Sequence, residues 1–308
     1  MKLIFDADHL VFVAAAAFED RCVELTHKET GEKRLFKHRT KAAEHVDLSD
    51  YTIEDIQTAG DKTQAFALIK QMIKKAQVAT GIEEYECVLG GQPSWRIERS
   101  TLLRYKGNRI GGYRPLLLQD CRNYLISHHP TEVVASAFEA DDVCVMKAYG
   151  TDNVITAVDK DYRGTPVRYF DMNHPNDGIL DCRCLGGLML KNGSLSGKGR
   201  KFFYAQILIG DVTDNYKPTC ATKAKFGDVG AYKLLSPLKT DGECWQAIVD
   251  MYQKWYPEPL IVEGWRGDQF EIDWLYVLQE MVDLAHMIRF DGDRLIVKDV
   301  LGRMGIDL

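Results

Sequence analysis

Acidic side chains occur in four groups along the chain, each where a strand or helix is expected to begin or end. The groups are Asp6 with the nearby Asp8, then Glu139, Asp141 and Asp142, then Asp159 and Asp161, and last Asp211 and Asp214. In an open α/β sheet, ligands bind beyond the carboxyl ends of the strands. Acids that follow different strands can therefore converge in one crevice, and the i, i+2 spacing of Asp159 and Asp161 places both on one face.

Carboxylates brought together in this way need a cation or a proton. Two bare carboxylates about 4 Å apart repel each other by roughly 4 kcal/mol at an effective dielectric constant near 20. A ligand set made only of oxygen atoms favours hard ions such as Mg²⁺ or Mn²⁺ over zinc. Two such ions can activate a water molecule and stabilise the leaving oxygen of a phosphodiester, so the acids predict metal-dependent phosphodiester hydrolysis.

Each acidic group also has a purely structural explanation. Ser136 and Glu139 fit a helix capping box, and the two aspartates that follow favour the helix dipole. Asp211 and Asp214 can be turn residues. Four groups at such positions in one chain still favour a shared metal site over four coincidences.

The segment from Trp95 to Arg114 is unusually basic for an acidic protein. It holds six cationic residues against one acid, Glu98, and the cations are Arg96, Arg99, Arg104, Lys106, Arg109 and Arg114. On a helix, Arg99, Lys106 and Arg109 share a face, while Trp95 and Tyr105 offer rings for stacking. This pattern is expected of an element that contacts a nucleic-acid backbone. The alternative is a solvated basic helix face.

A second basic patch consists of Lys198, Arg200 and Lys201. It lies in the glycine-rich connector GSLSGKGRK, which is expected to be flexible enough to follow a phosphate backbone.

The elements that must position these residues alternate between strand and helix. Strands are expected at residues 2–6, 85–91, 131–135 and 153–161, and helices at residues 10–18, 61–79 and 138–149. This alternation indicates an α/β fold with a mainly parallel, doubly wound sheet.

The intervening segments differ in character. Residues 21–38 are expected to form a hairpin, and the polar stretch of about 20 residues after it to be surface structure of low order. Residues 93–127 are expected to be helical, with an interruption at Gly111-Gly112. After residue 185 the chain is expected to be largely helical and to end in a short strand or extended segment at residues 294–299.

The overall composition sets wider bounds. With 308 residues the chain can bury a substantial core, and its net charge of −6 leaves local basic segments to carry any nucleic-acid binding. The eight cysteines are scattered and are expected to be reduced thiols. Asp6 and Asp8 interrupt the apolar N-terminal stretch, which argues against a signal peptide. No apolar run approaches the length of a membrane span, so a cytoplasmic protein without membrane contact is expected.

Five motifs, read together and in order, resemble a known family. FDADHLVF, RYKGNR, FEADD, TAVDKD and IGDVTDN, spanning residues 4 to 215, are similar to motifs of the 5′→3′ exonuclease/flap endonuclease family, especially its bacteriophage branch. The C-terminal segment HMIRFDGDRLIVKD also resembles the ending of those phage enzymes. The insert near residues 21–60 and parts of 220–285 lie outside the likeness.

The resemblance implies a fold, a division into domains and a chemistry. It implies a PIN-like sheet in residues 1–185 with a helical arch at about 93–127, and a helix–three-turn–helix DNA-binding and C-terminal helical region in residues 186–308. It further implies two Mg²⁺ or Mn²⁺ ions and the removal of 5′ strands or RNA primers during phage replication or recombination. The implied partner is duplex DNA with a 5′ end or flap, or an RNA–DNA hybrid, bound by a monomer in the host cytoplasm.

The resemblance also assigns roles to residues. The implied metal ligands are Asp6, Glu139, Asp141, Asp142, Asp159, Asp161, Asp211 and Asp214. Lys106 and Arg109 match arch residues that approach the scissile phosphate. The candidate DNA contacts are Arg99, Arg104, Tyr105, Lys160, Lys198, Arg200, Lys201, Lys217, Lys223 and Lys225, with Lys233 as a further duplex contact.

The chain departs from the family pattern at two places. Gly91 stands at or near a position where relatives often carry another acid, which makes Asp8 a candidate replacement. The family's G-x-G-x-K turn is reduced to Gly227 and Gly230, so a K⁺ site there is left open.

Two other functions remain open on the sequence. Asp6-Ala-Asp8 after a strand is similar to the nucleophile motif of haloacid-dehalogenase-like phosphatases, although Leu10 stands where that motif has Thr or Val. A non-catalytic DNA-binding relative, inactivated by the change at Gly91, is the other alternative.

Overall fold

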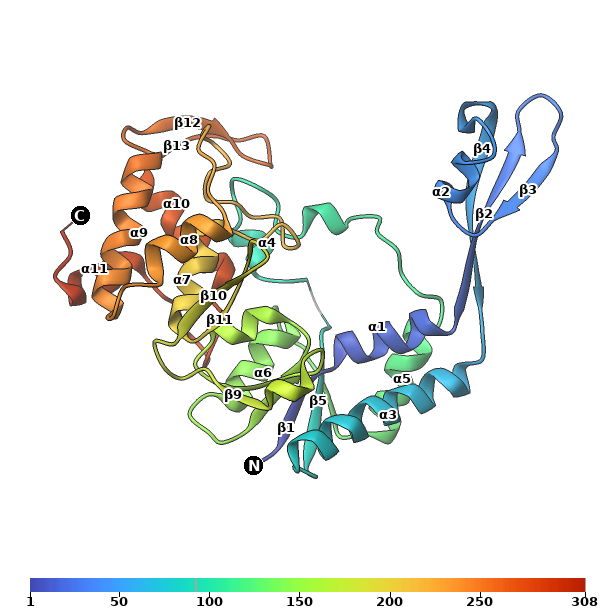
Figure 1. The fold of residues 1–308 in the computed structure, drawn as a ribbon, viewed down its shortest axis with the longest axis horizontal. Helices are drawn as coiled ribbons and strands as arrows, with labels where there is room; N and C mark the ends of the chain where they lie inside the picture. Colours follow the sequence, from blue (N-terminus) through green and yellow to red (C-terminus); the bar gives the residue numbers. More distant parts are fainter. Residues whose placement is uncertain (92, 308) are drawn as a thin grey trace. The chain divides into compact units, whose positions relative to one another are not determined.

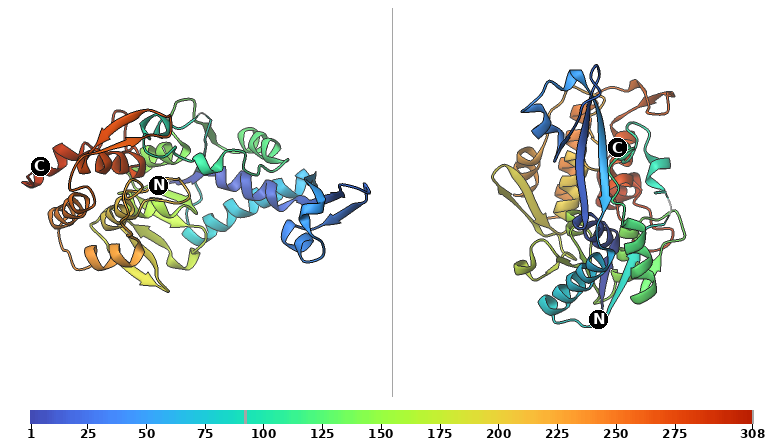
Figure 2. Two further views of the ribbon diagram at one scale, coloured as in Figure 1. Left: turned by 90° about the horizontal axis from the view of Figure 1, so that it is seen from above. Right: turned by 90° about the vertical axis from the view of Figure 1, so that its right-hand side faces the viewer.

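The computed structural model describes residues 1–91 and 93–307, which form two compact units. One unit consists of Met1–Ala7, Ala76–Gly112 and Thr131–Leu308, and the other of Asp8–Lys75 and Tyr113–Pro130. Figures 1 and 2 show the chain in three views. The domain boundary expected at residue 185 stays a prediction.

A mostly parallel sheet lies at the centre of the first unit (Figure 1). Its order is β6-β5-β1-β7-β8-β9, and every neighbouring pair is parallel except β8 with β9. The strands are β1 (Leu3–Asp6), β5 (Tyr85–Leu89), β6 (Thr131–Val133), β7 (Val154–Ala157), β8 (Arg168–Asp171) and β9 (Ile179–Asp181). The strands expected from the sequence, and with them the α/β class with a mainly parallel sheet, are confirmed.

The strand β1 is central because its residues suit burial on both faces. Leu3, Ile4 and Phe5 are almost completely buried, as expected for a strand inside a parallel sheet. The helix α6 (Ala140–Ala148) packs on β1, β5 and β7 through Val143, Val145 and neighbouring small residues. Asp6 is the last residue of β1 and therefore lies at the carboxyl edge of the sheet.

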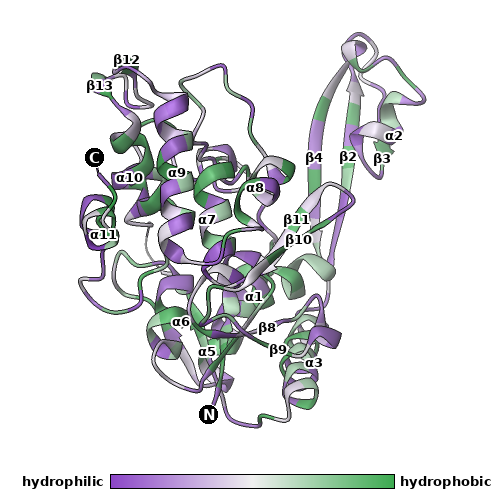
Figure 3. Cartoon of the chain, turned by 60° about the vertical axis from the view of Figure 1, so that its left-hand side comes forward, coloured by the Kyte–Doolittle hydropathy of each residue, from purple (hydrophilic) through white to green (hydrophobic). Residues whose placement is uncertain are grey.

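Helices and two hairpins complete the first unit. They are α7 (Arg200–Ile209), α8 (Asp228–Leu235), α9 (Asp241–Trp255), α10 (Trp274–Ala285) and α11 (Val297–Met304), with β10 (Gly187–Lys191) paired to β11 (Ser194–Lys198) and β12 (Leu260–Glu263) to β13 (Gln269–Ile272). Buried Trp245, Tyr252 and Leu278 belong to their shared core. Figure 3 shows the apolar residues as green stretches on α7, α8 and α10, which bury one face each.

The second unit contains four α-helices and a three-stranded antiparallel sheet of order β3-β2-β4. Its elements are α1 (Ala7–Ala17), β2 (Glu19–His27), β3 (Lys33–Phe36), α2 (Arg39–Ala43), β4 (Tyr51–Ala59), most of α3 (Lys62–Thr80) and α5 (Leu118–His128). The expected hairpin is confirmed, but the expectation of low order after it is wrong, because β4 pairs with β2 over nine residues. The polar composition misled, since this sheet is held largely by backbone pairing around a small core of Val23, Leu25 and Ala42.

The basic segment is not the helix expected from the sequence. Only α4 (Arg96–Arg99) and the 3₁₀ helix η2 (Gly107–Arg109) form before α5. Lys106 has a left-handed backbone with φ of 53°, and Gly111 also has positive φ, so a regular helix cannot pass through them. The shared helical face of Arg99, Lys106 and Arg109 is therefore wrong, and the helical arch stays unconfirmed.

Two further local expectations are wrong for identifiable reasons. The glycine-rich connector forms β11, because Asn192 and Gly193 both have positive φ and make a two-residue turn after β10. The expected extended ending at residues 294–299 gives way to α11 from Val297 onward, since Val297, Val300 and Leu301 bury a helical face.

Among the described residues, 1–91 and 93–307, no helix combines the length and the apolar character needed to cross a membrane.

Candidate metal centre

Three acidic residues gather where α6 begins. Glu139 is the N-cap residue, and Asp141 and Asp142 lie in the first turn. One carboxylate oxygen from each lies within 4.8 Å of the others. The capping box expected from Ser136 is not formed in that register, because Glu139 stands at the N-cap rather than three residues inside the helix. The helix start therefore brings three carboxylates to one place.

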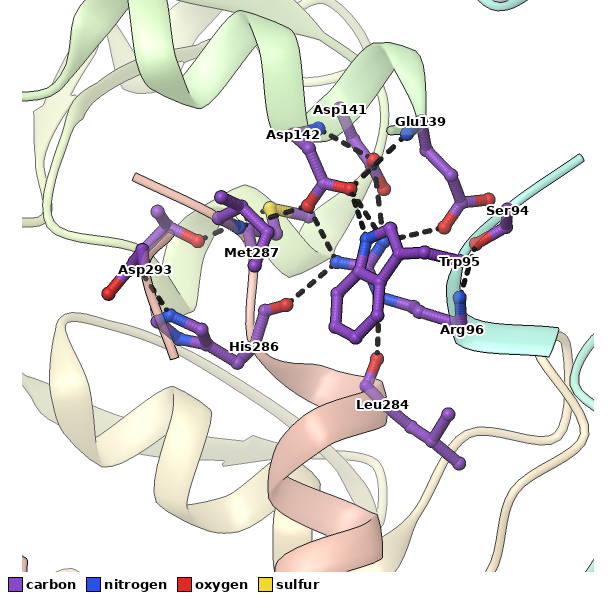
Figure 4. A network of polar contacts seen from close by, with 12 residues as sticks. Ser94, Trp95, Arg96, Glu139, Asp141, Asp142, Leu284, His286, Met287 and Asp293 are labelled. Carbon is purple, nitrogen blue, oxygen red and sulfur yellow. Dashed lines mark hydrogen bonds and ion pairs between the residues drawn. The ribbon is translucent and has the colours of Figure 1, made fainter. Parts of the chain in front are cut away.

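Arg96 is the central cation of this group (Figure 4). It is 1% exposed, and its two terminal nitrogens donate to both oxygens of Asp142 at 2.8 and 2.9 Å and to Glu139 at 2.7 Å. The remaining donors reach the backbone carbonyls of Leu284 (3.1 Å) and His286 (2.7 Å) at the end of α10. All five N–H groups of the guanidinium are thereby used. Arg96 ties the start of α6 to the end of α10.

Asp142 is fully buried, and its oxygens are saturated by protein donors. Besides Arg96, it accepts hydrogen bonds from the Trp95 indole at 2.9 Å and from the backbone N–H groups of Ile288 (2.9 Å) and Glu139 (3.2 Å). In this arrangement Asp142 orients its neighbours rather than facing an open coordination position. Its assignment as a metal ligand stays a prediction, and a structural role fits these contacts better.

The other two acids of the group have opposite electrostatic surroundings. Burial would raise the pKa of Glu139, but the charges of Lys106 and Arg96 outweigh it and lower that pKa to about 2. Burial, with the negative charges of Glu139 and Asp142, raises the pKa of Asp141 well above its usual range. An additional cation next to Asp141 would relieve this strain.

A second cluster of acids is formed by the residues that follow β7 and α7, namely Asp159, Asp161, Asp211 and Asp214. Asp159 caps the 3₁₀ helix η3 (Lys160–Gly164) by accepting from the Asp161 N–H at 2.9 Å. Asp211 accepts from the backbone of Thr213 at 2.6 Å and pairs with Lys160 at 2.9 Å. Asp211 therefore does act as a turn residue through one carboxylate oxygen, while its other oxygen pairs with Lys160.

Asp161 is the least satisfied acid of this group. Its Oδ1 is buried and has no hydrogen-bond partner among the described residues. Burial, and next the charge of Asp159, raise the pKa of Asp161 well above its usual range, with Asp211 and Asp214 adding to the effect. An unpaired buried carboxylate oxygen is costly, so a cation or other donor is expected here.

Two tyrosines connect the acidic groups. The hydroxyl of Tyr105 donates to Asp214 at 2.7 Å and lies 3.2 Å from Glu139. The hydroxyl of Tyr162 donates to Asp6 at 3.2 Å. Burial, and then the charges of Asp6 and, more weakly, of other acids, raise the pKa of Tyr162.

These other acids include Asp141 and Asp159. Acids from all four groups therefore lie around Tyr105 and Tyr162, as the sequence predicts from the carboxyl ends of parallel strands.

Lys106 and Arg109 both contact these acids, although no α-helix carries the two residues. Lys106 pairs with Glu139, and its backbone N–H donates to the Asp214 carbonyl at 2.8 Å. Arg109 pairs with Asp214 at 2.6 Å and donates to the Thr213 carbonyl at 3.1 Å. The side chain of Arg109 is about half exposed. The two cations thus span both acidic groups, and Arg109 remains accessible to an anionic substrate.

The candidate DNA contacts fall into two sets. Those exposed to solvent are Arg99, Arg104, Lys160, Lys198, Lys217, Lys223, Lys225 and Lys233. Tyr105 is 2% exposed and Lys201 is 5% exposed. Lys201 donates to the carbonyls of Ser236 and Leu238 at the end of α8, and Arg200 forms a two-pronged pair with Asp241. Tyr105, Arg200 and Lys201 are therefore held by the protein itself.

Gly91 and Asp8 bear on the carboxylate expected after the second strand. A Cβ atom at Gly91 would lie 2.2 Å from the Val134 carbonyl oxygen, so the backbone approach there requires glycine. Asp8 lies in α1 and pairs with Arg122 at 2.8 Å within the second unit. Asp8 as a replacement ligand stays a prediction.

The sequence did not single out Arg96, Tyr162 or Glu280. Glu280 of α10 accepts from the Thr101 and Leu102 N–H groups at 2.9 and 3.0 Å and so anchors the basic segment. Arg96 was one of six nearby cations, and Tyr162 and Glu280 lie outside the motifs. Only the adjacency of Tyr162 to Asp161 offered a signal.

Asp293 and His286 form a pair that supports Arg96, and Figure 4 shows the contact between them. Asp293 accepts from Nε and from one terminal nitrogen of the Arg289 guanidinium, both at 2.8 Å, and lies 2.9 Å from His286 Nε2. Burial would raise the pKa of Asp293, but the hydrogen bonds from Arg289 and His286 hold it well below its usual range. His286 also supplies a carbonyl to Arg96, so this pair steadies the central arginine.

The low pKa of Asp293 predicts an acid-dependent stability. Its contribution is full above the unfolded-state pKa near ~4 and is lost as the pH falls through the lower folded-state value. Asp293→Asn is therefore expected to lower the free energy of unfolding by about 1.5–3 kcal/mol near neutral pH and by progressively less below ~4. Urea unfolding of the variant and the unaltered chain, at pH values from neutral to below ~4, measures the loss of stability. The exposed Asp291→Asn serves as the control. A difference that stays constant on acidification contradicts the assignment.

The donor set fits a hard divalent cation. The acids that lie together offer oxygen atoms alone, as Mg²⁺ and Mn²⁺ prefer. The raised pKa values of Asp141 and Asp161 and the unpartnered oxygen of Asp161 mark where negative charge is least compensated. Glu139, Asp141, Asp159, Asp161 and their neighbours can therefore hold such ions.

No protein-family model matches the chain, and no curated protein matches it. Among solved structures, the chain is similar to the T5 D15 protein co-crystallized with metal ions, at 14% sequence identity and a TM-score of 0.43 over 92% of this chain and 99% of that one.

Proposed function

We propose that this chain is a divalent-metal-dependent 5′→3′ exodeoxyribonuclease of the 5′ nuclease family that its motifs resemble. It would hydrolyse phosphodiester bonds from 5′ ends of duplex DNA, with flap endonuclease and RNase H-like primer removal as related activities in phage replication or recombination. The observation that carries the proposal is the convergence of acids from four segments at one edge of a parallel sheet. Lys106 and Arg109 lie among those acids.

The protein groups divide the work. Asp6, Glu139, Asp141, Asp159, Asp161, Asp211 and Asp214 would hold the ions, with Asp142 fixing Arg96 and the start of α6. Bound divalent ions supply an activated water and stabilise the leaving oxygen. Lys106 and Arg109 would orient the scissile phosphate, since each can exchange a carboxylate for a phosphate oxygen. Tyr105 would keep Glu139 and Asp214 in register.

DNA is the proposed partner, and a monomer in the host cytoplasm the proposed state. Exposed cations suit a phosphate backbone, and they are Arg99, Arg104, Lys160, Lys198, Lys217, Lys223, Lys225 and Lys233. Most of them lie in loops or at element ends, where they can adapt to the backbone.

Asp159→Asn is expected to reduce cleavage of 5′-labelled duplex and flap DNA in Mg²⁺ by about 100-fold or more. Asparagine keeps the oxygen that accepts from Asp161 N–H but removes the charge. Asp47→Asn is a matched control, because Asp47 caps the 3₁₀ helix η1 (Leu48–Asp50) through the same contact at 3.0 Å in the other unit. Gel analysis of both variants beside the unaltered chain measures the effect.

The same assay separates the alternatives. DNA binding without cleavage by the unaltered chain would support the non-catalytic relative and overturn the enzyme proposal. Phosphate release from small phosphomonoesters, without cutting of DNA, would support the phosphatase.

A further inference from the structure

The hairpin of β12 and β13 contacts the basic segment, although Trp265 and Ser100 are 165 residues apart in the chain. In the turn of the hairpin, the Trp265 indole N–H donates to the Ser100 carbonyl at 2.8 Å, and the Trp265 backbone N–H donates to the Thr101 carbonyl at 3.1 Å. Arg266 donates to the carbonyls of Ser100 and Ile97, both at 2.7 Å. The turn is therefore fixed to the backbone of the basic segment.

The strands of this hairpin are anchored in the helical core of the first unit. Ile272 of β13 is 1% exposed and belongs to that core. Val262 and Phe270 pack against it from the two strands. The core therefore sets the position of the turn, and the family resemblance assigns the hairpin no role.

The side chain of Arg104 lies over the ring of Trp265, with its guanidinium carbon 5.2 Å from the ring centroid. It is exposed and makes no hydrogen bond or ion pair within residues 1–91 and 93–307. The guanidinium of Arg266 lies 4.1 Å from the same centroid, but both of its terminal nitrogens already donate to carbonyls. Arg104 therefore keeps its N–H donors available, while the ring restricts where its side chain lies.

The backbone of Arg104 is held at the edge of the metal centre. Its carbonyl accepts from Asn215 Nδ2 at 2.9 Å, and Asn215 directly follows Asp214. Two residues after Arg104, Lys106 pairs with Glu139. The fold thus holds this arginine at both its backbone and its side chain, close in the chain to the cations proposed to orient the scissile phosphate.

From this arrangement we infer that Trp265 is a positioning residue, which holds Arg104 ready to bind a DNA phosphate near the scissile one. The inference rests on the proposed function, because it takes DNA as the ligand. A guanidinium binds phosphate best through two parallel hydrogen bonds, which need a defined orientation. A side chain that is oriented before binding loses less conformational entropy when the ligand arrives. Stacking on the indole provides this restriction without using any N–H donor.

Binding of labelled duplex DNA by the full chain in EDTA, followed by fluorescence anisotropy at several salt concentrations, tests the inference. Arg104→Ala is expected to weaken binding about tenfold and to reduce the slope of log K against log salt by about one, because one phosphate contact is lost. Trp265→Leu removes the ring but no charge and should weaken binding about threefold. Trp265→Phe keeps a ring for Arg104 and should bind within about twofold of the unaltered chain.

A double variant separates positioning from a general structural effect. In the Arg104→Ala background, Trp265→Leu should weaken binding no further, because the residue through which it acts is gone. Ile261→Ala, an exposed apolar change on the same hairpin, is the matched control and should leave binding unchanged. The inference is overturned if Trp265→Leu has no effect, if its effect is the same with and without Arg104, or if Ile261→Ala weakens binding equally.

These outcomes are distinct from a failure of the nuclease proposal. The binding assay contains no free divalent metal, whereas cleavage of DNA in Mg²⁺ decides the nuclease proposal separately. A chain that cleaves DNA but shows no coupling between Trp265 and Arg104 keeps the nuclease function and overturns the inference. Absence of DNA binding in EDTA overturns it as well.

Discussion

Replacing Arg96 with methionine is expected to lower the free energy of unfolding by about 3–5 kcal/mol. Arg96 is 1% exposed and is the main counter-charge of Asp142, and it shares Glu139 with Lys106. Burial opposes the charged form of Arg96, but Asp142 and the neighbouring acids hold its pKa well above the usual range. Methionine fills much of the space but leaves the fully buried Asp142 without its counter-ion, which is the costly way to break a buried pair.

Urea unfolding at neutral pH measures this effect, and α4 supplies the control. Arg99→Met removes the same charge from an exposed position three residues away, where substitutions usually change stability by less than about 0.5 kcal/mol. In the Arg96 variant we also expect weaker Mg²⁺ binding, since Glu139 loses the contact that orients it. Equal stability of the two variants would show that Arg96 does not carry the buried charge.

Asp141→Asn is expected to separate stability from activity. In the absence of metal, the free energy of unfolding of the variant should exceed that of the unaltered chain by about 0.5–2 kcal/mol near neutral pH. It should also cleave DNA at least about 100-fold more slowly in Mg²⁺. Asp141 has a raised pKa in the fold, because burial and the charges of Glu139 and Asp142 oppose its ionisation.

The sign of the pH dependence follows from that raised pKa. A group whose folded-state pKa lies above its unfolded-state value destabilises the fold once the pH exceeds the unfolded value of ~4. The gain from Asp141→Asn should therefore be small near pH ~3 and grow toward neutrality. Asparagine keeps the oxygen that accepts from the Asp142 N–H at 2.7 Å, so the start of α6 is preserved.

Unfolding with and without Mg²⁺, together with the cleavage assay, measures both parts. Mg²⁺ is expected to stabilise the unaltered chain more than the Asp141 variant, because a bound ion stabilises the state that binds it. Asp268→Asn, exposed in the turn between β12 and β13, serves as the control. An Asp141 variant that is less stable yet still cleaves would contradict a metal-holding role for this acid.

The sequence determined the parallel sheet and the meeting of its acids. The buried strand around Ile4, the run at residues 154–157 and the amphipathic α3 have patterns that specify strand or helix locally. Parallel strands then bring Asp6 and Asp159 to the same edge by geometry alone. The acidic groups were predictable because each lies within a few residues of a strongly patterned element.

Only the tertiary structure decided the path of the basic segment. Its route depends on the Asp214 carbonyl, on Glu280 and on a left-handed backbone at Lys106, none of which local helix propensity reports. Lys106 and Arg109 still reach the acids, because hydrogen bonds to residues about a hundred positions away replace the expected helix face. The strand β4 was missed for a similar reason, since its pairing with β2 outweighs its polar composition.

The division of roles among the acids was likewise decided by the fold. Asp141 and Asp142 are neighbours in sequence and identical in type, yet Asp142 is saturated by donors, whereas Asp141 has only a long ion pair with Arg96 (3.9 Å) and a raised pKa. The difference comes from Arg96. It joins α6 to the carbonyls of Leu284 and His286, which lie 188 and 190 residues after Arg96 in the chain. The sequence shows which residues can carry charge, whereas long-range packing decides which charges are paired and which remain for a metal ion.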